Sequence, residues 1–204
     1  KDEYIPLMKE HDVPDWYIKS CEKIKYMFPK AHAAAYVTNA FRIAWFKVHI
    51  PLAYYAAYFS IRAKAFDASC MIFGKEKVKN KMKEIEMKNQ KKEATKAELD
   101  MYDDLEIVLE MYERGFEFLP VDLYESEATK FKVQENKLRP PLNSIPGFGG
   151  VAAQGIVEAR KDGKFMSIDD LKIRAKIGAS GADLLKEFGC LEGMSQSNQL
   201  SLFG

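Results

Sequence analysis

Apolar residues recur at steps of three and four along the first half of the chain, the pattern of helices with one buried face. We predict five helices between residues 15 and 114, separated by prolines or begun at capping residues. The first helix follows Pro14, with Asp15 as its cap. The second covers residues 31–49 and the third covers 52 to about 64. The fourth follows Asp67 and the fifth follows Thr95.

Two of these helices carry clear apolar stripes. In the second, Tyr36, Phe41 and Trp45 belong to a stripe that we expect to face a core. The buried face expected for the fifth helix consists of Leu99, Tyr102, Leu105, Leu109 and Tyr112. We expect Asp103 and Asp104, which are adjacent in that helix, to lie on its exposed acidic face and not to ligate a metal.

The pattern changes after Gly115. Residues 128–133 alternate between apolar and polar side chains, and a turn at 134–137 follows, which predicts a small β-hairpin. A double proline, Pro140 and Pro141, then precedes a second helical region from 142 to about 191 and a polar tail. The predicted fold class is therefore mainly α with a small β-hairpin.

The composition limits the class of protein. The chain has 204 residues, of which 47% are hydrophobic, so it can bury a core without disulfides. A net charge of +1 means that any contact with a polyanion depends on local patches. Three cysteines without a paired spacing, no apolar run long enough to cross a membrane and an N-terminus unlike a secretory signal predict a cytoplasmic protein without membrane contact.

The segment most informative about chemistry is a glycine-rich turn between two short helices, within residues 143–153. We expect Gly147 and Gly149 to adopt backbone angles that other residues resist, so that the main chain presents its N–H groups to a ligand. A helix N-terminus follows and favours a phosphate. The contacts expected to bind DNA here are made by Gly147, Phe148, Gly149, Gly150 and Val151.

A second, looser turn of the same kind is predicted at residues 176–181. Two such hairpins, related by a pseudo-twofold axis, would contact both strands of a duplex without reading its bases. The other residues expected at phosphates are Arg160, Lys161, Lys164, Lys176 and Gly178, with Arg174 nearby. The alternative interpretation is a tight turn between packed helices with no ligand.

The first turn resembles the helix-hairpin-helix motif, and the whole chain resembles a larger family. The residues that carry this likeness include Pro14 to Ile18, Tyr26 to Val37, Tyr112 to Phe116, Val121 to Tyr124, Gly189 to Leu191 and Gln199 to Phe203. In order and spacing they are similar to the C-terminal end of the PolC-type alpha subunit of bacterial DNA polymerase III. The resemblance implies helical fingers over 1–118, a β-hairpin linker over 119–141, a tandem helix-hairpin-helix module over 142–193 and a clamp-binding tail over 194–204.

In that family the fingers help to hold the incoming nucleotide and the template. Lys30 and His32 stand at a helix start, where phosphate can bind, and Arg42 follows about three turns later. Spacing alone favours a solvated lysine and a packing histidine, whereas the resemblance implies nucleotide or template contacts for all three. His11 and His49 receive no role.

The resemblance also implies that catalysis depends on Mg²⁺ held by aspartates of a palm domain earlier in the polypeptide. No matching palm occurs in this sequence, so we expect no catalytic or metal-binding residue in the chain, and no polymerase activity from the chain alone. The partners implied are duplex primer-template DNA, a deoxynucleoside triphosphate in the parent enzyme, and the rest of the polymerase, in the bacterial cytoplasm at the nucleoid.

The tail resembles the peptide by which this family binds a sliding clamp. The clamp-binding residues implied are Gln199, Leu200, Ser201, Leu202 and Phe203. Leucine and phenylalanine would enter an apolar pocket while the glutamine makes a polar contact. The alternative is a chain end that folds back on the preceding module.

Two further functions remain open at this level. One is a free-standing helix-hairpin-helix protein that binds DNA or serves as a repair scaffold, with the N-terminal helices as a partner surface. The other is a structural helical protein without a nucleic-acid partner, which would show no salt-dependent binding to DNA.

Overall fold

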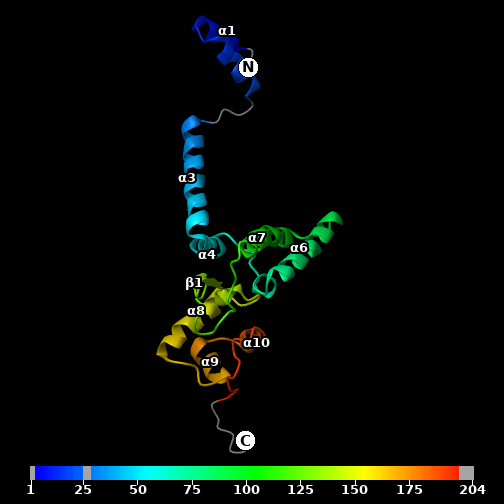
Figure 1. The fold of residues 1–204 in the computed structure, drawn as a ribbon, viewed down its shortest axis with the longest axis vertical. Helices are drawn as coiled ribbons and strands as arrows, with labels where there is room; N and C mark the ends of the chain where they lie inside the picture. Colours follow the sequence, from blue (N-terminus) through cyan, green and yellow to red (C-terminus); the bar gives the residue numbers. More distant parts are fainter. Residues whose placement is uncertain (1–2, 25–28, 198–204) are drawn as a thin grey trace, which may run out of the picture. The chain divides into compact units, whose positions relative to one another are not determined.

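The computed structural model describes residues 3–24 and 29–197, and it confirms a mainly helical fold with one small β-hairpin (Figure 1). Contacts between Cα atoms divide the chain into two units, 1–45 and 46–204, which are described separately below. The four sequence-predicted segments, with boundaries near 118, 141 and 193, stay a prediction.

The first unit contains α1 (Tyr4–Glu10), α2 (Asp15–Lys23) and most of α3 (Lys30–His49). The sequence pattern did not predict α1. Around Ile18, which is buried, α1 and α2 pack against each other. Asp15 is not the cap of α2, because Pro14 holds the N-cap position in an extended conformation and Asp15 is the first helical residue.

The range predicted for α3 is confirmed, but the prediction that its stripe faces a core is wrong for this structure. No residue of α3 is buried. Phe41, in the middle of the predicted stripe, has 73% of its surface exposed.

The second unit begins with four helices: α4 (Pro51–Ile61), α5 (Ala68–Met71), α6 (Lys75–Gln90) and α7 (Lys96–Glu113). In Figure 1, α6 and α7 lie side by side as a helical hairpin. The Asp67 side chain caps α5 by accepting the Ser69 N–H at 2.7 Å, as predicted. The single helix predicted here is two helices, because α5 ends at Met71 and Gly74, with a φ of +96°, holds the N-cap position of α6.

The start of α7 agrees with the prediction, whereas its buried face agrees only in part. Thr95 and Glu98 form a reciprocal capping box, which confirms the start. The buried residues of the helix are Asp104, Leu105, Val108 and Met111. Leu99 is exposed, while Tyr102, Leu109 and Tyr112 are partly buried against the same core.

The expectation that Asp104 lies on an exposed face is therefore wrong. Its side chain is 5% exposed, and Oδ2 accepts the Ala65 N–H at 3.1 Å. Burial raises the pKa of the Asp104 carboxyl to about 6, against the opposing effect of that hydrogen bond.

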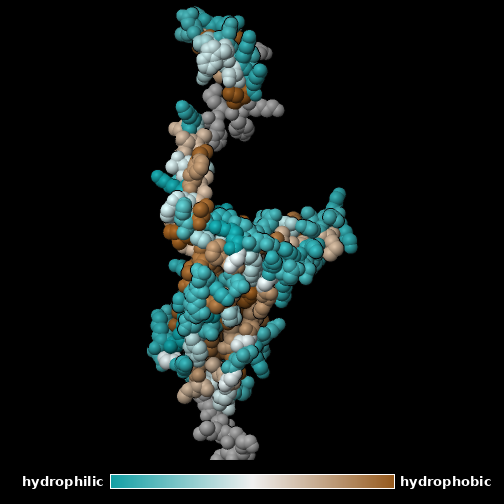
Figure 2. All heavy atoms as spheres, viewed as in Figure 1, coloured by the Kyte–Doolittle hydropathy of each residue, from teal (hydrophilic) through white to brown (hydrophobic). Residues whose placement is uncertain are grey.

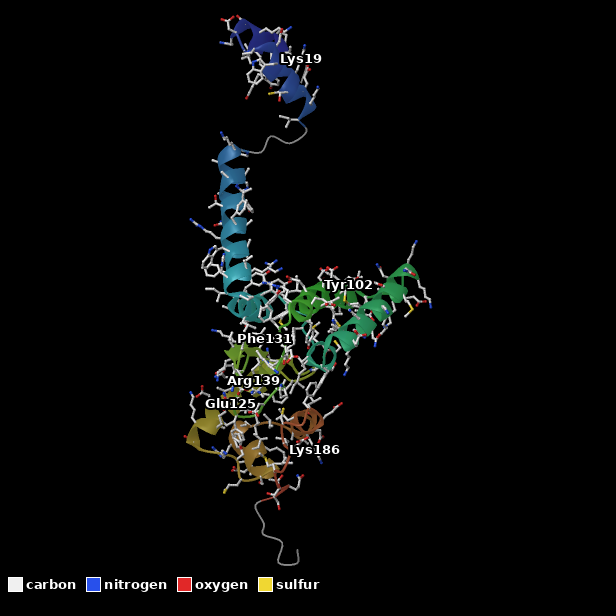
Figure 3. All side chains as sticks on the ribbon, in the orientation of Figure 1. Lys19, Tyr102, Glu125, Phe131, Arg139 and Lys186 are labelled. Carbon is white, nitrogen blue, oxygen red and sulfur yellow. The ribbon has the colours of Figure 1, made fainter. Side chains whose placement is uncertain are left out.

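The predicted β-hairpin is confirmed, with shorter strands. Antiparallel β1 (Lys132–Gln134) and β2 (Lys137–Arg139) are joined by Glu135 and Asn136, which both have positive φ, as a two-residue hairpin turn requires. Arg139, labelled in Figure 3, is buried and donates to the Gln134 side chain and to the Pro120 carbonyl oxygen. The hairpin is thereby fixed to the preceding loop.

Three helices and two short 3-10 turns complete the second unit. They are η1 (Leu142–Ser144), α8 (Gly150–Ala159), η2 (Arg160–Asp162), α9 (Ile168–Ala175) and α10 (Ala179–Glu187). Their shared core includes Leu142, Ile156, Leu171 and Leu185. A Cβ at Gly155 would lie closer than 3.0 Å to the Ala175 carbonyl oxygen, so the close approach of the α9 backbone requires a glycine at this position inside α8.

Candidate nucleic-acid interface

The first glycine turn has one residue with an unusual backbone conformation. Gly147 has a φ of +79°, which L side chains rarely adopt. Gly149 has a φ of −72° and a ψ of 151°, so the expectation of an unusual conformation there is wrong. Between them, Phe148 is 4% exposed and packs into the core, so only the main chain of this residue faces outward.

The second turn repeats the first in conformation. Lys176 has a φ of +55°, Ile177 is 7% exposed, and Gly178 has a φ of −75°. These positions correspond in order to 147, 148 and 149, and each pair is separated by the same 29 residues (147 to 176, 148 to 177, 149 to 178). The correspondence continues into the helices, where Ala153 and Ala182, and then Ile156 and Leu185, are buried.

The first turn contacts α10, the helix that follows the second turn. A Cβ at Gly181 would lie 3.4 Å from Cε2 of Phe148, and a Cβ at Gly147 would lie 3.5 Å from Cδ1 of Leu184. The first turn therefore packs against the first two turns of α10. In Figure 1 the three helices α8, α9 and α10 lie together near the C-terminal end of the second unit.

Both helices that follow these turns begin with main-chain N–H groups that no side chain caps. The N-cap residues of α8 and α10 are Gly149 and Gly178, which have no side chain to accept a hydrogen bond. Within the described ranges, no acceptor is found for the amides of residues 150–152 and 179–181. Each helix start thus offers free donors and the positive end of a helix dipole.

The helix between them differs. In α9 the Ser167 side chain accepts the Asp170 N–H, and the carbonyl oxygens of Ser195 and Gln196 accept the N–H groups of Ile168 and Asp169 at 2.9 and 3.2 Å. Other residues of the chain therefore accept the N–H groups at the start of α9, whereas the N–H donors at the starts of α8 and α10 stay available to a ligand.

The space in front of the two N-cap glycines is open. A Cβ at Gly149 or Gly178 would meet no heavy atom within 4 Å. Val151, in the first turn of α8, is 91% exposed. A rigid backbone such as a sugar-phosphate strand can approach the free amides without displacing protein atoms.

The five nearby cations fall into two groups. Arg160 donates to the carbonyl oxygens of Leu123 and Ser126, and Arg174 donates to those of Ala159, Gly163 and Lys164, so both arginines hold loops together. The lysines at 161, 164 and 176 are exposed. Of these, Lys161 pairs with Glu158 at 2.5 Å, and the Lys164 ammonium lies 5.9 Å from the Tyr124 ring centre.

The three residues predicted to contact nucleotide or template all lie on α3 but do not share one face. Lys30 and His32 are both in the first turn, about 200° apart around the axis. Arg42 lies about 18 Å further along the helix. The His32 ring lies tilted against that of Tyr36, with centres 4.5 Å apart.

Other predicted residues have no described site. Among residues 3–24 and 29–197, no group of three or more His, Cys, Asp or Glu side chains is placed to hold a metal ion. The clamp-binding residues 199–203, and residues 26–28 of the resemblance, lie outside the described ranges.

Sequence reasoning predicted the second turn as a looser one and did not name the amides of residues 179–181, which are equivalent as donors to those of 150–152. The signal was present, because a glycine precedes each helix at the same place relative to a buried apolar residue. The lysine at 176 obscured it, since it occupies the left-handed position that glycine holds in the first turn.

Comparisons with known proteins agree with this geometry. A family profile described as a helix-hairpin-helix motif matches residues 115–200. The chain is similar to proteins named DNA polymerase III PolC-type: 53% identity over 203 residues with that of Oceanobacillus iheyensis, covering 100% of this chain. Identity is 54% over 201 residues with that of Halalkalibacterium halodurans and 52% over 201 with that of Caldanaerobacter subterraneus, each covering 98% of this chain. The chain spans 14% of the length of each of these relatives.

Proposed function

Because this chain is homologous along its whole length to one segment of PolC-type DNA polymerase III, we propose that it holds duplex DNA in a replicative polymerase. The observation that carries this proposal is the pair of uncapped helix starts behind Gly149 and Gly178, which repeat one conformation and pack together. Two sets of free amides suit two phosphodiester strands, and neither set reads a base.

The strength of binding follows from the few charges available. With both arginines engaged by carbonyl groups, the exposed cations of the predicted set are Lys161, which also pairs with Glu158, Lys164 and Lys176. About three phosphate contacts predict that log K falls with log salt with a slope of about −3. Binding should therefore be weak at physiological salt and independent of sequence.

The test replaces each N-cap glycine by aspartate. Asp is a better N-cap than Gly, so Gly149→Asp and Gly178→Asp should keep or raise the melting temperature. Each carboxylate accepts the helix-start amides and repels phosphate, so duplex affinity should fall at least tenfold in fluorescence anisotropy. Asn80→Asp, which adds the same charge at an exposed site on α6, is the matched control and should retain affinity apart from a small general effect.

Two results would overturn the proposal. One is the absence of any salt-dependent binding by the unaltered chain. The other is a Gly149→Asp, Gly178→Asp double variant that binds duplex as well as Asn80→Asp does.

We assign the chemistry of nucleotide addition to the rest of the polymerase. Mg²⁺ would be held by palm aspartates outside this chain, while Lys30, His32 and Arg42 would contact the incoming nucleotide or the template. The opposite faces of Lys30 and His32 favour two different ligands over one shared site. The isolated chain should incorporate no nucleotide on a primed template with Mg²⁺, and measurable synthesis would contradict this assignment.

We further propose that residues 199–203 bind a sliding clamp. The hydrogen bonds of Ser195 and Gln196 to the start of α9 support this, because they fix the point from which the tail leaves the DNA-binding helices. From 196 to 199 the chain can reach at most about 11 Å, so the clamp would sit close to the duplex-binding turns. Replacing Leu202 and Phe203 by alanine should abolish co-elution with the clamp and leave duplex affinity unchanged, whereas equal loss of both would contradict two separate sites. With DNA and a clamp as its partners, the protein would work at the nucleoid in the bacterial cytoplasm.

A further inference from the structure

The longest helix of the described chain exposes its apolar residues. None of the 20 residues of α3 is buried. Exposed fractions reach 73% for Phe41, 67% for Tyr36, 65% for Val48, 57% for Ile43 and 54% for Val37. Figure 3 shows side chains projecting on all sides of this helix, and in Figure 2 brown, tan and white residues predominate along it.

These residues form two faces of the helix. At 100° per residue, Val37, Phe41 and Val48 lie within about 40° of one another. Ile43 and Tyr36 lie roughly 130° away around the axis. A helix that is apolar on more than one side is typical of the interior of a large protein, whereas a surface helix has one apolar stripe.

The two faces narrow the choice of partner. A second copy of α3 packed as a helix pair would cover one face and leave the other in water. Among the described residues, no helix is long and apolar enough to cross a membrane. A protein that contacts α3 from two sides would cover both faces.

We propose that α3 is an interior helix of the polymerase, enclosed on both faces by parts of the same polypeptide that lie outside this chain. Relatives that match the chain over 98–100% of its length carry it as only 14% of their own, so most of the polypeptide is available to enclose it. This inference rests on the proposed function, because it places the chain inside a polymerase. It goes further by assigning α3 a packing role in addition to any contact with nucleotide.

The test compares the same substitutions in two settings. Phe41→Lys changes the first face and Ile43→Lys the second, and Met87→Lys on α6, where Met87 is 57% exposed, is the matched control. In the isolated chain, all three variants should match the unaltered chain in melting temperature and remain monomeric in sedimentation. In the whole polymerase, Phe41→Lys and Ile43→Lys should each lower the melting temperature by at least about 3 °C, while Met87→Lys should not.

Three outcomes would overturn the inference. In the first, the whole polymerase is as stable with either α3 variant as with Met87→Lys. In the second, only one α3 variant destabilises the polymerase, which means that a single face is covered. In the third, the isolated chain is a dimer that Phe41→Lys dissociates, which means that a second copy is the partner. Duplex affinity of the isolated chain is measured alongside. It should not change with Phe41→Lys, so failure of this inference is distinguishable from failure of DNA binding.

Discussion

The backbones of α8 and α9 approach each other closely at Gly155, which predicts a measurable loss of stability in Gly155→Ala. The added methyl group would meet the Ala175 carbonyl oxygen closer than 3.0 Å and its carbonyl carbon at 3.4 Å. Both atoms are main chain, so no side chain can swing aside, and α8 and α9 must separate. Such overpacking costs about 2–3 kcal/mol, and the better helix propensity of alanine returns about 1 kcal/mol.

We therefore expect Gly155→Ala to lower the free energy of unfolding by about 1–2 kcal/mol and the melting temperature by about 2–8 °C. Circular dichroism on heating and in urea measures both. Gly150→Ala is the control in the same helix, because its methyl group would lie 3.6 Å from Cγ2 of Thr129, an ordinary contact. A Gly155→Ala chain that melts at or above the temperature of the unaltered chain would refute the reasoning.

Three further variants or labels probe separate features. Lys176→Gly should keep the free energy of unfolding or raise it by up to about 1 kcal/mol, because the left-handed φ of +55° suits glycine. The same variant loses one cation, so the slope of log K against log salt should become shallower by about 0.9. An unchanged slope would show that Lys176 does not contact DNA. The pKa of the Asp104 carboxyl is about 6 in the folded chain, against an ordinary value of 3.8. The neutral acid therefore stabilises the fold fully below about pH 4, and this contribution is lost as the pH rises through 6. Asp104→Asn should therefore gain about 1–3 kcal/mol at pH 8 and nothing at pH 4 in thermal melts, and an equal effect at both pH values would contradict a buried carboxylate. Burial raises the pKa of the Cys70 thiol to about 11 and that of Cys190 to about 12, so few of these two thiols are ionised at pH 8. A thiol reagent should therefore label Cys21 first. Equal labelling rates for all three cysteines would contradict the burial of Cys70 and Cys190.

Local signals in the sequence predicted local structure well. Thr95 with Glu98 and Asp67 with Ser69 are contacts within three residues, so the sequence alone contains both partners. The glycine turns and their helices belong to the same class. The break at Gly74 was missed because periodicity continues across it, and only the backbone angle shows the interruption.

Features that depend on distant residues were not predictable from the pattern. Asp104 is buried, and the donor that satisfies its carboxylate is the N–H of Ala65, 39 residues earlier. Arg160 looked free for phosphate, yet it donates to carbonyl groups 34 and 37 residues away. The sequence identified the stripe of α3 correctly as apolar, but no pattern within the helix specifies which other part of a protein packs against that stripe.

The central claim is that free amides at two helix starts bind the phosphates of a duplex. Amide chemical shifts in ¹⁵N-labelled protein, followed as a blunt duplex is added at low salt, test it most directly. We predict that the largest shifts fall on residues 150–152 and 179–181, with little change at Ile168 and Asp169, whose amides are already bonded within the chain. Shifts that leave both helix starts unchanged, or that appear at only one of them, would contradict the claim.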